Sequence, residues 1–331
     1  MKFIYLFFIL LFSSSISSET ILLKDGRKFD GKVIAESKNS YRIEIDGKVK
    51  KISKSKIAKL DAKETVDQIA HALDDSEIFF LSCKENKIEA VKNFIKKKPE
   101  IVNSKNSYGD TPLIVASDNG RLEIVKLLLQ SQVELNEKNN EGETALMMAV
   151  DGGYLDIVRA LIKSGADINL KNSDDESSLF IATERGFTDI VKILIDKNAN
   201  VNAKNRTRET PLMIACDKGN LEIVRLLIYN DANVNSKNAN RETALMIASD
   251  RGYTDIVKLL LHNDANVNTK NKFGWTALMM ASYNGYLPIV KLLLNSDADP
   301  EIKNKNSDNA QKMATQNGYH EIAELLKNFK K

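Results

Sequence analysis

A period of 33 residues dominates the chain from about residue 75 onward. Six consecutive units open with a Thr/Ser-x-Leu triplet, at Thr111, Thr144, Ser177, Thr210, Thr243 and Thr276. An Ala, a Gly and an Ile-Val pair follow at fixed places in every unit. Units this short cannot bury their apolar faces alone, so neighbours must stack to make a core. The repeat therefore predicts a solenoid and excludes a fold built around a single core.

Residue types within one unit predict two short helices and a hairpin. Thr111 suits an N-cap and Pro112 the first helical position. Ala116 allows close helix packing, and Gly120 supplies the left-handed residue that ends the first helix. Val125 lies on the buried stripe of the second helix. Second helices are expected to end near Gln132, Gly165, Asn198, Asp231, Asp264 and Asp297. These are mostly Gly, Asn or Asp, the residues that best tolerate positive φ.

This pattern resembles the ankyrin repeat family over residues 75–331, about three quarters of the chain. The resemblance implies a mainly α ankyrin-repeat solenoid of about eight units, with caps at 75–106 and 305–331. Phe79, Ser82 and Val91 stand in the first cap for Leu113, Ala116 and Val125. The chain departs from the family's Thr-Pro-Leu-His motif at one position. Its His position holds Ile114, Met147, Phe180, Met213, Met246 and Met279, which predicts apolar packing in place of a hydrogen bond.

Residues 1–18 have the three parts of a secretory signal peptide. Lys2 precedes an apolar run at 3–12, and the small residues Ser15 and Ser17 fit a cleavage site. Ten apolar residues are too few for a membrane span of about 20. No other stretch is apolar enough, so no transmembrane span is expected after signal removal. We expect an exported protein, periplasmic or secreted, from a bacterium with an AT-rich genome.

Residues 19–60 alternate apolar and polar side chains between turn signals such as Asp46-Gly47, which predicts about five short strands. Closure into a small barrel, resembling Sm-like or Tudor-like modules, would bury such a short sheet. Lysines crowd its end, at Lys48, Lys50, Lys51, Lys54, Lys56 and Lys59. They indicate either a polyanion-binding surface or a solvated strand edge. Residues 61–74 are predicted to be a helical linker.

Catalytic and metal-binding patterns are not found. The chain lacks a P-loop, a dinucleotide-binding glycine motif and a Gly-x-Ser-x-Gly motif. His71, His262 and His320 are far apart in the sequence. Cys83 and Cys216 hold equivalent positions four units apart, roughly 35–40 Å, too far for a disulfide. No enzyme activity, cofactor, metal or small-molecule substrate is expected, and the net charge of +3 argues against nucleic acid.

Ankyrin arrays usually bind partners on a concave surface made of hairpin tips and exposed first-helix positions. Carried over by alignment, the candidate contacts are Tyr108, Asp118, Asp151, Arg185, Arg208, Lys218, Arg241, Arg251, Phe273, Trp275 and Tyr283. Trp275, the only tryptophan, is either a binding anchor or a packing residue against the C-terminal cap. Arg208 and Arg241 replace a hairpin glycine, which indicates either binding side chains or an altered turn.

Two functions remain open from the sequence. The first is an exported, monomeric scaffold that binds a partner protein on the concave ankyrin surface. The second is a structural protein tethered to the cell envelope, whose basic module at 19–60 holds a polyanion.

Overall fold

The computed structural model describes residues 74–329 in full, and the backbone of residues 19–23, 28–36, 40–45, 48–53 and 57–60. The chain divides into two units, Met1–Ile78 and Phe79–Lys331. The predicted signal peptide at 1–18 and all but the last residue of the predicted linker at 61–74 lie outside the described residues.

Five strands in the first unit form an antiparallel sheet in the order β4-β3-β2-β1-β5. They are β1 (Glu19–Leu23), β2 (Lys28–Glu36), β3 (Ser40–Ile45), β4 (Lys48–Ser53) and β5 (Ile57–Leu60). Strands β3 and β4 pair from Ser40↔Ser53 to Ile45↔Lys48. This pairing matches the register expected for a hairpin centred on residues 46–47. Closure of the sheet into a barrel stays a prediction.

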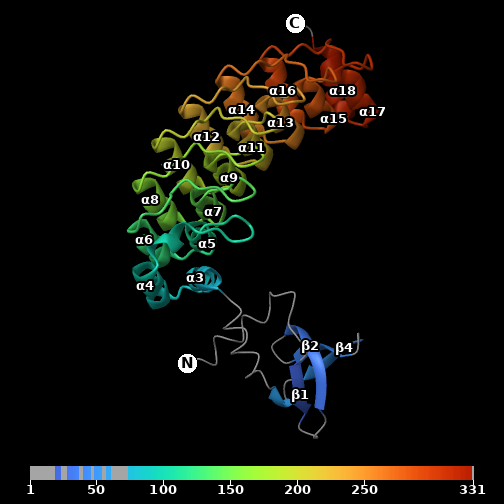
Figure 1. Ribbon diagram of the computed structural model, residues 1–331. Coiled ribbons are helices and arrows are strands. Elements are labelled where there is room, and N and C mark those ends of the chain that lie inside the picture. Colours follow the sequence, from blue (N-terminus) through green and yellow to red (C-terminus); the bar gives the residue numbers. More distant parts are fainter. Residues whose placement is uncertain are drawn as a thin grey trace. The chain divides into compact units, whose positions relative to one another are not determined.

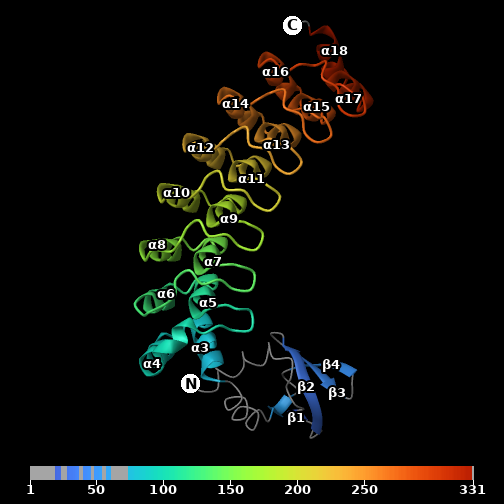
Figure 2. The ribbon, with the colours of Figure 1, turned by 45° about the horizontal axis from the view of Figure 1, so that its top comes forward.

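The second unit is a stack of helix pairs (Figures 1 and 2). The first pair is α3 (Asp75–Lys84) and α4 (Ile88–Lys97), followed by the 3-10 helix η2 (Pro99–Asn103). The later first helices are α5 (Pro112–Asp118), α7 (Ala145–Asp151), α9 (Ser178–Arg185), α11 (Pro211–Lys218), α13 (Ala244–Arg251), α15 (Ala277–Tyr283) and α17 (Ala310–Gln316). Their second helices are α6 (Leu122–Leu129), α8 (Leu155–Lys163), α10 (Thr188–Asp196), α12 (Leu221–Tyr229), α14 (Thr254–His262), α16 (Leu287–Asn295) and α18 (His320–Asn328).

The array curves so that first helices and hairpins line its inner side and second helices its outer side (Figure 2). Its core is one buried apolar cluster that runs from Phe79 to Leu326, shared between neighbours at every step. Phe79, Ser82 and Val91 are almost fully buried, which confirms their alignment with the regular units. Among the described residues, no helix is long and apolar enough to cross a membrane.

Local sequence chemistry explains where the helices begin and end. The Thr144 hydroxyl accepts a hydrogen bond from the Met147 backbone N–H at 3.3 Å, and four other first helices repeat this N-cap. Helix α11 ends at Lys218, and its C-cap Gly219 has a φ of +72°. A Cβ at Gly219 would also lie 2.6 Å from the Tyr253 ring of the next unit. Both the positive φ and the lack of space therefore require glycine at this position.

Second helices end near the expected residue in all six regular units. Gly165, Asn198, Asp231, Asp264 and Asp297 all have positive φ. Gln132, the one expected end that is not Gly, Asn or Asp, is not among the described residues with positive φ. Helix α6 ends at Leu129, with Gln130 as its C-cap. Glutamine lacks the short amide or carboxylate that lets Asn and Asp tolerate the left-handed region.

An asparagine at the end of most units ties each repeat to the next. The Asn169 side-chain oxygen accepts the Asn200 backbone N–H at 2.8 Å, and its amide donates to the Asn198 carbonyl at 3.3 Å. Asn202 and Asn235 make the same pair of bonds one and two units later. These bonds satisfy loop backbone groups between units and hold the hairpins in register.

Both cysteines are free thiols buried inside first helices, Cys83 in α3 and Cys216 in α11. Burial raises the pKa of the Cys83 thiol to about 12 and raises the pKa of Cys216 as well. A thiol that stays protonated is a poor nucleophile, so both residues act as small packing groups. The methionines at the family's His position are equally buried, with Met147, Met213 and Met279 each 1% exposed.

Candidate partner-binding surface

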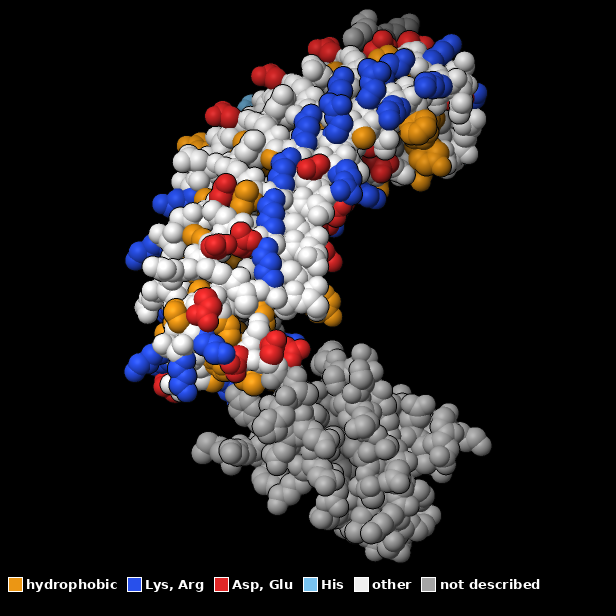
Figure 3. All heavy atoms as spheres, in the orientation of Figure 1, with side chains coloured by type: hydrophobic (Ala, Val, Ile, Leu, Met, Phe, Trp, Pro, Cys, Tyr) orange, Lys and Arg blue, Asp and Glu red, His pale blue; other side chains and the backbone are white. Residues whose placement is uncertain are grey.

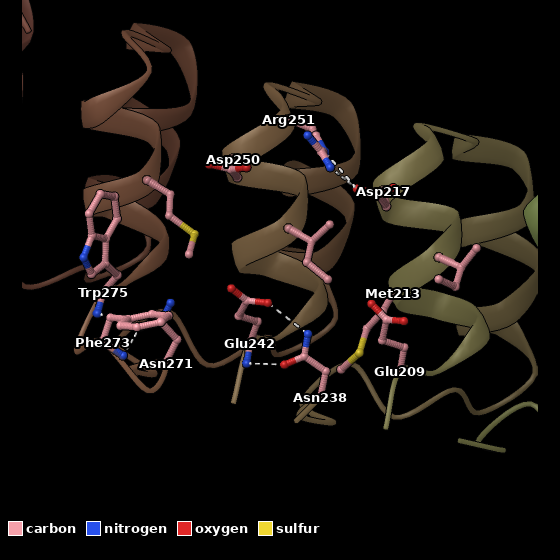
Figure 4. A pocket seen from close by; sticks show the side chains of 13 residues that line it. Glu209, Met213, Asp217, Asn238, Glu242, Asp250, Arg251, Asn271, Phe273 and Trp275 are labelled. Atoms are coloured by element: carbon pink, nitrogen blue, oxygen red, sulfur yellow. Dashed lines mark hydrogen bonds and ion pairs between the residues drawn. The ribbon is translucent and has the colours of Figure 1, made fainter. Parts of the chain in front are cut away.

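The hairpins on the inner side of the array are built around a buried asparagine. The Asn238 side-chain oxygen accepts the backbone N–H groups of Asn240 and Glu242, each at 2.9 Å. Its amide donates to the Glu242 carboxylate at 2.9 Å (Figure 4). Asn172 and Asn205 bond their own hairpins in the same way. The tips are thus held in shape before any partner arrives, which lowers the entropy lost on binding.

A hollow of about 480 Å³ opens on this inner side, over helices α11, α13 and α15 (Figure 4). Met213, Ile247 and Met280 contribute apolar side chains, and Phe273 and Trp275 are its aromatic residues. The full lining is Glu209, Met213, Ile214, Asp217, Asn238, Glu242, Ile247, Asp250, Arg251, Asn271, Phe273, Trp275 and Met280. Polar and charged side chains make up about half of this lining, so the hollow combines an apolar and aromatic surface with groups that can form hydrogen bonds or ion pairs.

Two of the aromatic residues predicted as contacts, Phe273 and Trp275, line the C-terminal end of this hollow, and a third, Tyr283, packs on Trp275. The rings of Trp275 and Tyr283 meet edge to face, with centroids 5.4 Å apart and planes at 63°. Phe273 is 59% exposed and Tyr283 is 44% exposed. The Asn271 oxygen accepts the backbone N–H groups of both Phe273 and Trp275. Trp275 therefore packs on Tyr283 of its own unit and also lines the hollow.

The hairpin arginines keep the turn that glycine makes elsewhere. Arg208 has φ +64° and Arg241 has φ +62°, close to Gly142 at +77° and Gly274 at +81°. The expectation of an altered turn is therefore wrong. The buried asparagine and the inter-unit hydrogen bonds impose one backbone path on every tip, whatever residue occupies it. Both arginines are exposed on the inner rim.

Other predicted contacts pair with acidic residues on the neighbouring unit. Arg185 binds Asp151 at 2.7 Å and Arg251 binds Asp217 at 2.7 Å. Lys218 lies 3.6 Å from Glu184. Such exposed pairs contribute only about 0–1 kcal/mol to stability. They hold the charged side chains along the inner faces of first helices α7 to α13, where a partner would meet them as pairs.

The remaining predicted contacts lie in the first regular units. Tyr108 is 72% exposed on the first hairpin, five units before the equivalent Phe273. Asp118 ends helix α5 on an acidic part of the inner face. Burial raises the pKa of the Asp118 carboxyl, and the charges of Asp110 and Asp151 raise it further. These residues do not share the aromatic hollow.

Sequence reasoning did not single out Asn238, Ile214 and Ile247 as lining residues. Ile214 and Ile247 occupy a first-helix position that is only partly buried, and an apolar residue there was one available signal. Their place in the hollow depends on the curvature between units. Among the described residues, no group of three or more His, Cys, Asp or Glu side chains could hold a metal ion.

Comparison with known proteins identifies the family of the repeats. The family model described as ankyrin repeats (3 copies) matches residues 58–139, 78–172, 179–271 and 245–331. The chain is also similar to an ankyrin repeat protein of Rickettsia bellii (strain RML369-C). The two are 33% identical over 60 residues, which make up 17% of this chain and 36% of the relative. The match therefore spans about a third of that protein's length.

Proposed function

Because this chain belongs to the ankyrin repeat family, we propose that its array is a non-enzymatic scaffold that binds a partner protein on the concave face. Ankyrin repeats generally mediate protein–protein interaction. The observation that supports this site is the aromatic group at the inner hollow, where Phe273 is exposed, Trp275 is partly buried and Tyr283 packs on Trp275. Aromatic side chains in a preformed hollow are the usual hot spots of protein interfaces.

The test is capture of the partner in the cells that produce the protein. Chemical crosslinking followed by mass spectrometry identifies the protein captured by the unmodified array. Replacing Phe273→Ala and Trp275→Ala together should remove at least about nine tenths of that capture, as expected for hot-spot residues.

The matched control is Tyr229→Ala, since Tyr229 is 88% exposed at the end of outer helix α12. This control should capture the same protein at the wild-type level. Crosslinks that map to the outer helices, or capture that survives the double replacement, would contradict the proposal.

We also propose that the scaffold works outside the cytoplasm, in the periplasm or after secretion. The support is the charged, apolar and small-residue order of positions 1–18. Amino-terminal sequencing of the protein from fractionated cells should find it outside the cytoplasm and starting near residue 19. A cytoplasmic protein that retains Met1 would refute export.

A second candidate function is a tether, favoured by the lysines crowded at positions 48–59. In that case the module at 19–60 binds an envelope polyanion and carries the array with it. Deleting residues 19–60 should then move the array from the envelope fraction to the soluble fraction. If the fractionation does not change, the tether function is refuted and only the scaffold proposal remains.

A further inference from the structure

The charge of the hairpin tips reverses along the array. Tips 138–143 (KNNEGE) and 171–176 (KNSDDE) carry two and three acidic residues beside one lysine. Tips 237–242 (KNANRE), 270–275 (KNKFGW) and 303–308 (KNKNSD) carry two basic residues each and at most one acidic residue. Figure 3 shows Lys and Arg side chains in a row along this face, denser toward the C-terminal end. Tip 204–209 (KNRTRE) carries three basic residues and one acidic residue, so the basic side comprises the last four tips. In the first of these four, Arg206 already pairs with Asp174 of the preceding acidic tip.

In the first units, the lysine that begins the tip bonds to the neighbouring unit. Lys105 donates to the Lys138 carbonyl at 3.0 Å and pairs with Glu137 at 2.7 Å. Lys138 and Lys171 each donate to the carbonyl of the next lysine in the row, at 2.6 Å. Within the described part of the chain, no ion pair or side-chain hydrogen bond engages the five tip cations Arg241, Lys270, Lys272, Lys303 and Lys305. Their charge is available to a ligand.

These five cations line one hollow of about 640 Å³ between the last tips. Asn271, Gly274 and Asn304 complete the lining, and no carboxylate is part of it. Asn304 is 7% exposed and its amide nitrogen has no hydrogen-bond partner among the described residues. The equivalent Asn238 amide donates to Glu242. The hollow therefore presents like charges that repel one another, and an anionic ligand would relieve that repulsion.

We propose that the basic tips at 237–242, 270–275 and 303–308 bind an acidic segment of the partner protein. This inference rests on the proposed function and specifies the partner's chemistry. The hollow at the tips shares Asn271 with the aromatic hollow, so one partner can occupy both. Phe273, exposed on the same tip as Lys272, offers an apolar contact beside the charges.

Geometry defines the segment further. Neighbouring units are about 8–10 Å apart, the spacing of packed helices. An extended peptide covers that distance with about three residues. The segment that fits is therefore extended, carries a carboxylate about every third residue, and has apolar residues between. Its binding is expected to weaken as salt screens the exposed charges.

The probe is a fluorescein-labelled peptide made of four Glu-Val-Ala triplets, titrated with the full-length protein and followed by fluorescence anisotropy. Lys272→Glu together with Lys305→Glu should raise Kd at least about tenfold, since two contacts change from attractive to repulsive. The control pair Lys163→Glu and Lys192→Glu makes the same charge change on outer helices α8 and α10. Its Kd should stay within about twofold of wild type. Thermal unfolding by circular dichroism verifies that both variants are folded.

Other outcomes overturn the inference in distinguishable ways. A peptide that does not bind, or binds the Lys272→Glu, Lys305→Glu variant as tightly as the control, refutes the acidic-segment site. Oligothymidylate that binds more tightly than the peptide assigns the tips to nucleic acid instead. In both of these cases, the scaffold function still stands if native crosslinking depends on Phe273 and Trp275. If native crosslinking does not depend on Phe273 and Trp275 while the peptide still binds, the aromatic site is refuted and the acidic-segment site stands.

Discussion

At the scale of single residues, the hairpin arginines add an exposed positive charge at a cost in folding stability. Arg208 and Arg241 adopt the left-handed backbone that Gly142 and Gly274 adopt in other units. A side chain with a Cβ costs roughly 1–2 kcal/mol in that region. Neither side chain is buried in the array. The strained backbone at these positions is therefore not offset by packing of the arginine side chains. This is consistent with a contribution of the two side chains to binding.

Replacing Arg208→Gly and Arg241→Gly should raise the free energy of unfolding by about 1 kcal/mol per site, because the strain is removed. Urea denaturation measures this change. The variants Arg208→Gln and Arg241→Gln remove the charge but keep the Cβ, and they should show no such gain. An equal gain in both sets would locate the penalty in charge repulsion and contradict the backbone explanation.

At the scale of the helix, N-caps determine where each first helix begins. Thr144 supplies a side-chain acceptor to the Met147 N–H at the start of α7. Ser177 occupies the same position before α9, but its hydroxyl makes no cap bond and has no partner among the described residues. Two aligned residues with similar side chains thus contribute differently to their helices.

Thr144→Ala should lower the free energy of unfolding by about 1–2 kcal/mol, the usual cost of losing a capping side chain. Ser177→Ala removes a buried hydroxyl that makes no hydrogen bond, so its effect should stay within about 0.5 kcal/mol. Chemical denaturation of the two variants side by side measures the difference. Equal losses would mean that Ser177 caps α9 in solution.

At the scale of the whole array, charges on neighbouring units act together on the inner face. Burial raises the pKa of Glu143, and Glu141, Asp151 and Asp110 raise it further, against the hydrogen bond from Asn139. Burial likewise raises the pKa of Glu176, with added repulsion from Glu184, Asp174 and Glu209. A raised carboxyl pKa means that the folded array binds the proton more tightly than the unfolded chain. Stability from these groups is therefore lost as pH rises through their pKa values.

Glu143→Gln with Glu176→Gln should raise Tm at pH 7, because burial and neighbouring carboxylates disfavour the charged form of both side chains in the folded array. The gain should disappear near pH 4, around the ordinary glutamate pKa of about 4.3, because the wild-type groups are then largely protonated. Thermal unfolding at several pH values measures this convergence. The exposed Glu301→Gln serves as the control. A gain that grows toward low pH would contradict the sign of the shift.

The sequence by itself determined the repeat period, the helix starts at threonine and the helix ends at glycine. It also identified the cap residues and the C-terminal aromatic group. Each of these depends on local backbone chemistry or on spacing along the chain.

Only the tertiary structure decided which of the candidate contacts come together. Arg185 and Asp151 are 34 residues apart and become partners because two helices stack in register. Phe273 and Trp275 reach one hollow with Ile247, while Tyr108, in the same hairpin position as Phe273, lies five units away. The tip cations share a second hollow, and Arg241 keeps a glycine-like turn. Residues a repeat apart meet only through the stacking and curvature of the units, which local spacing does not specify.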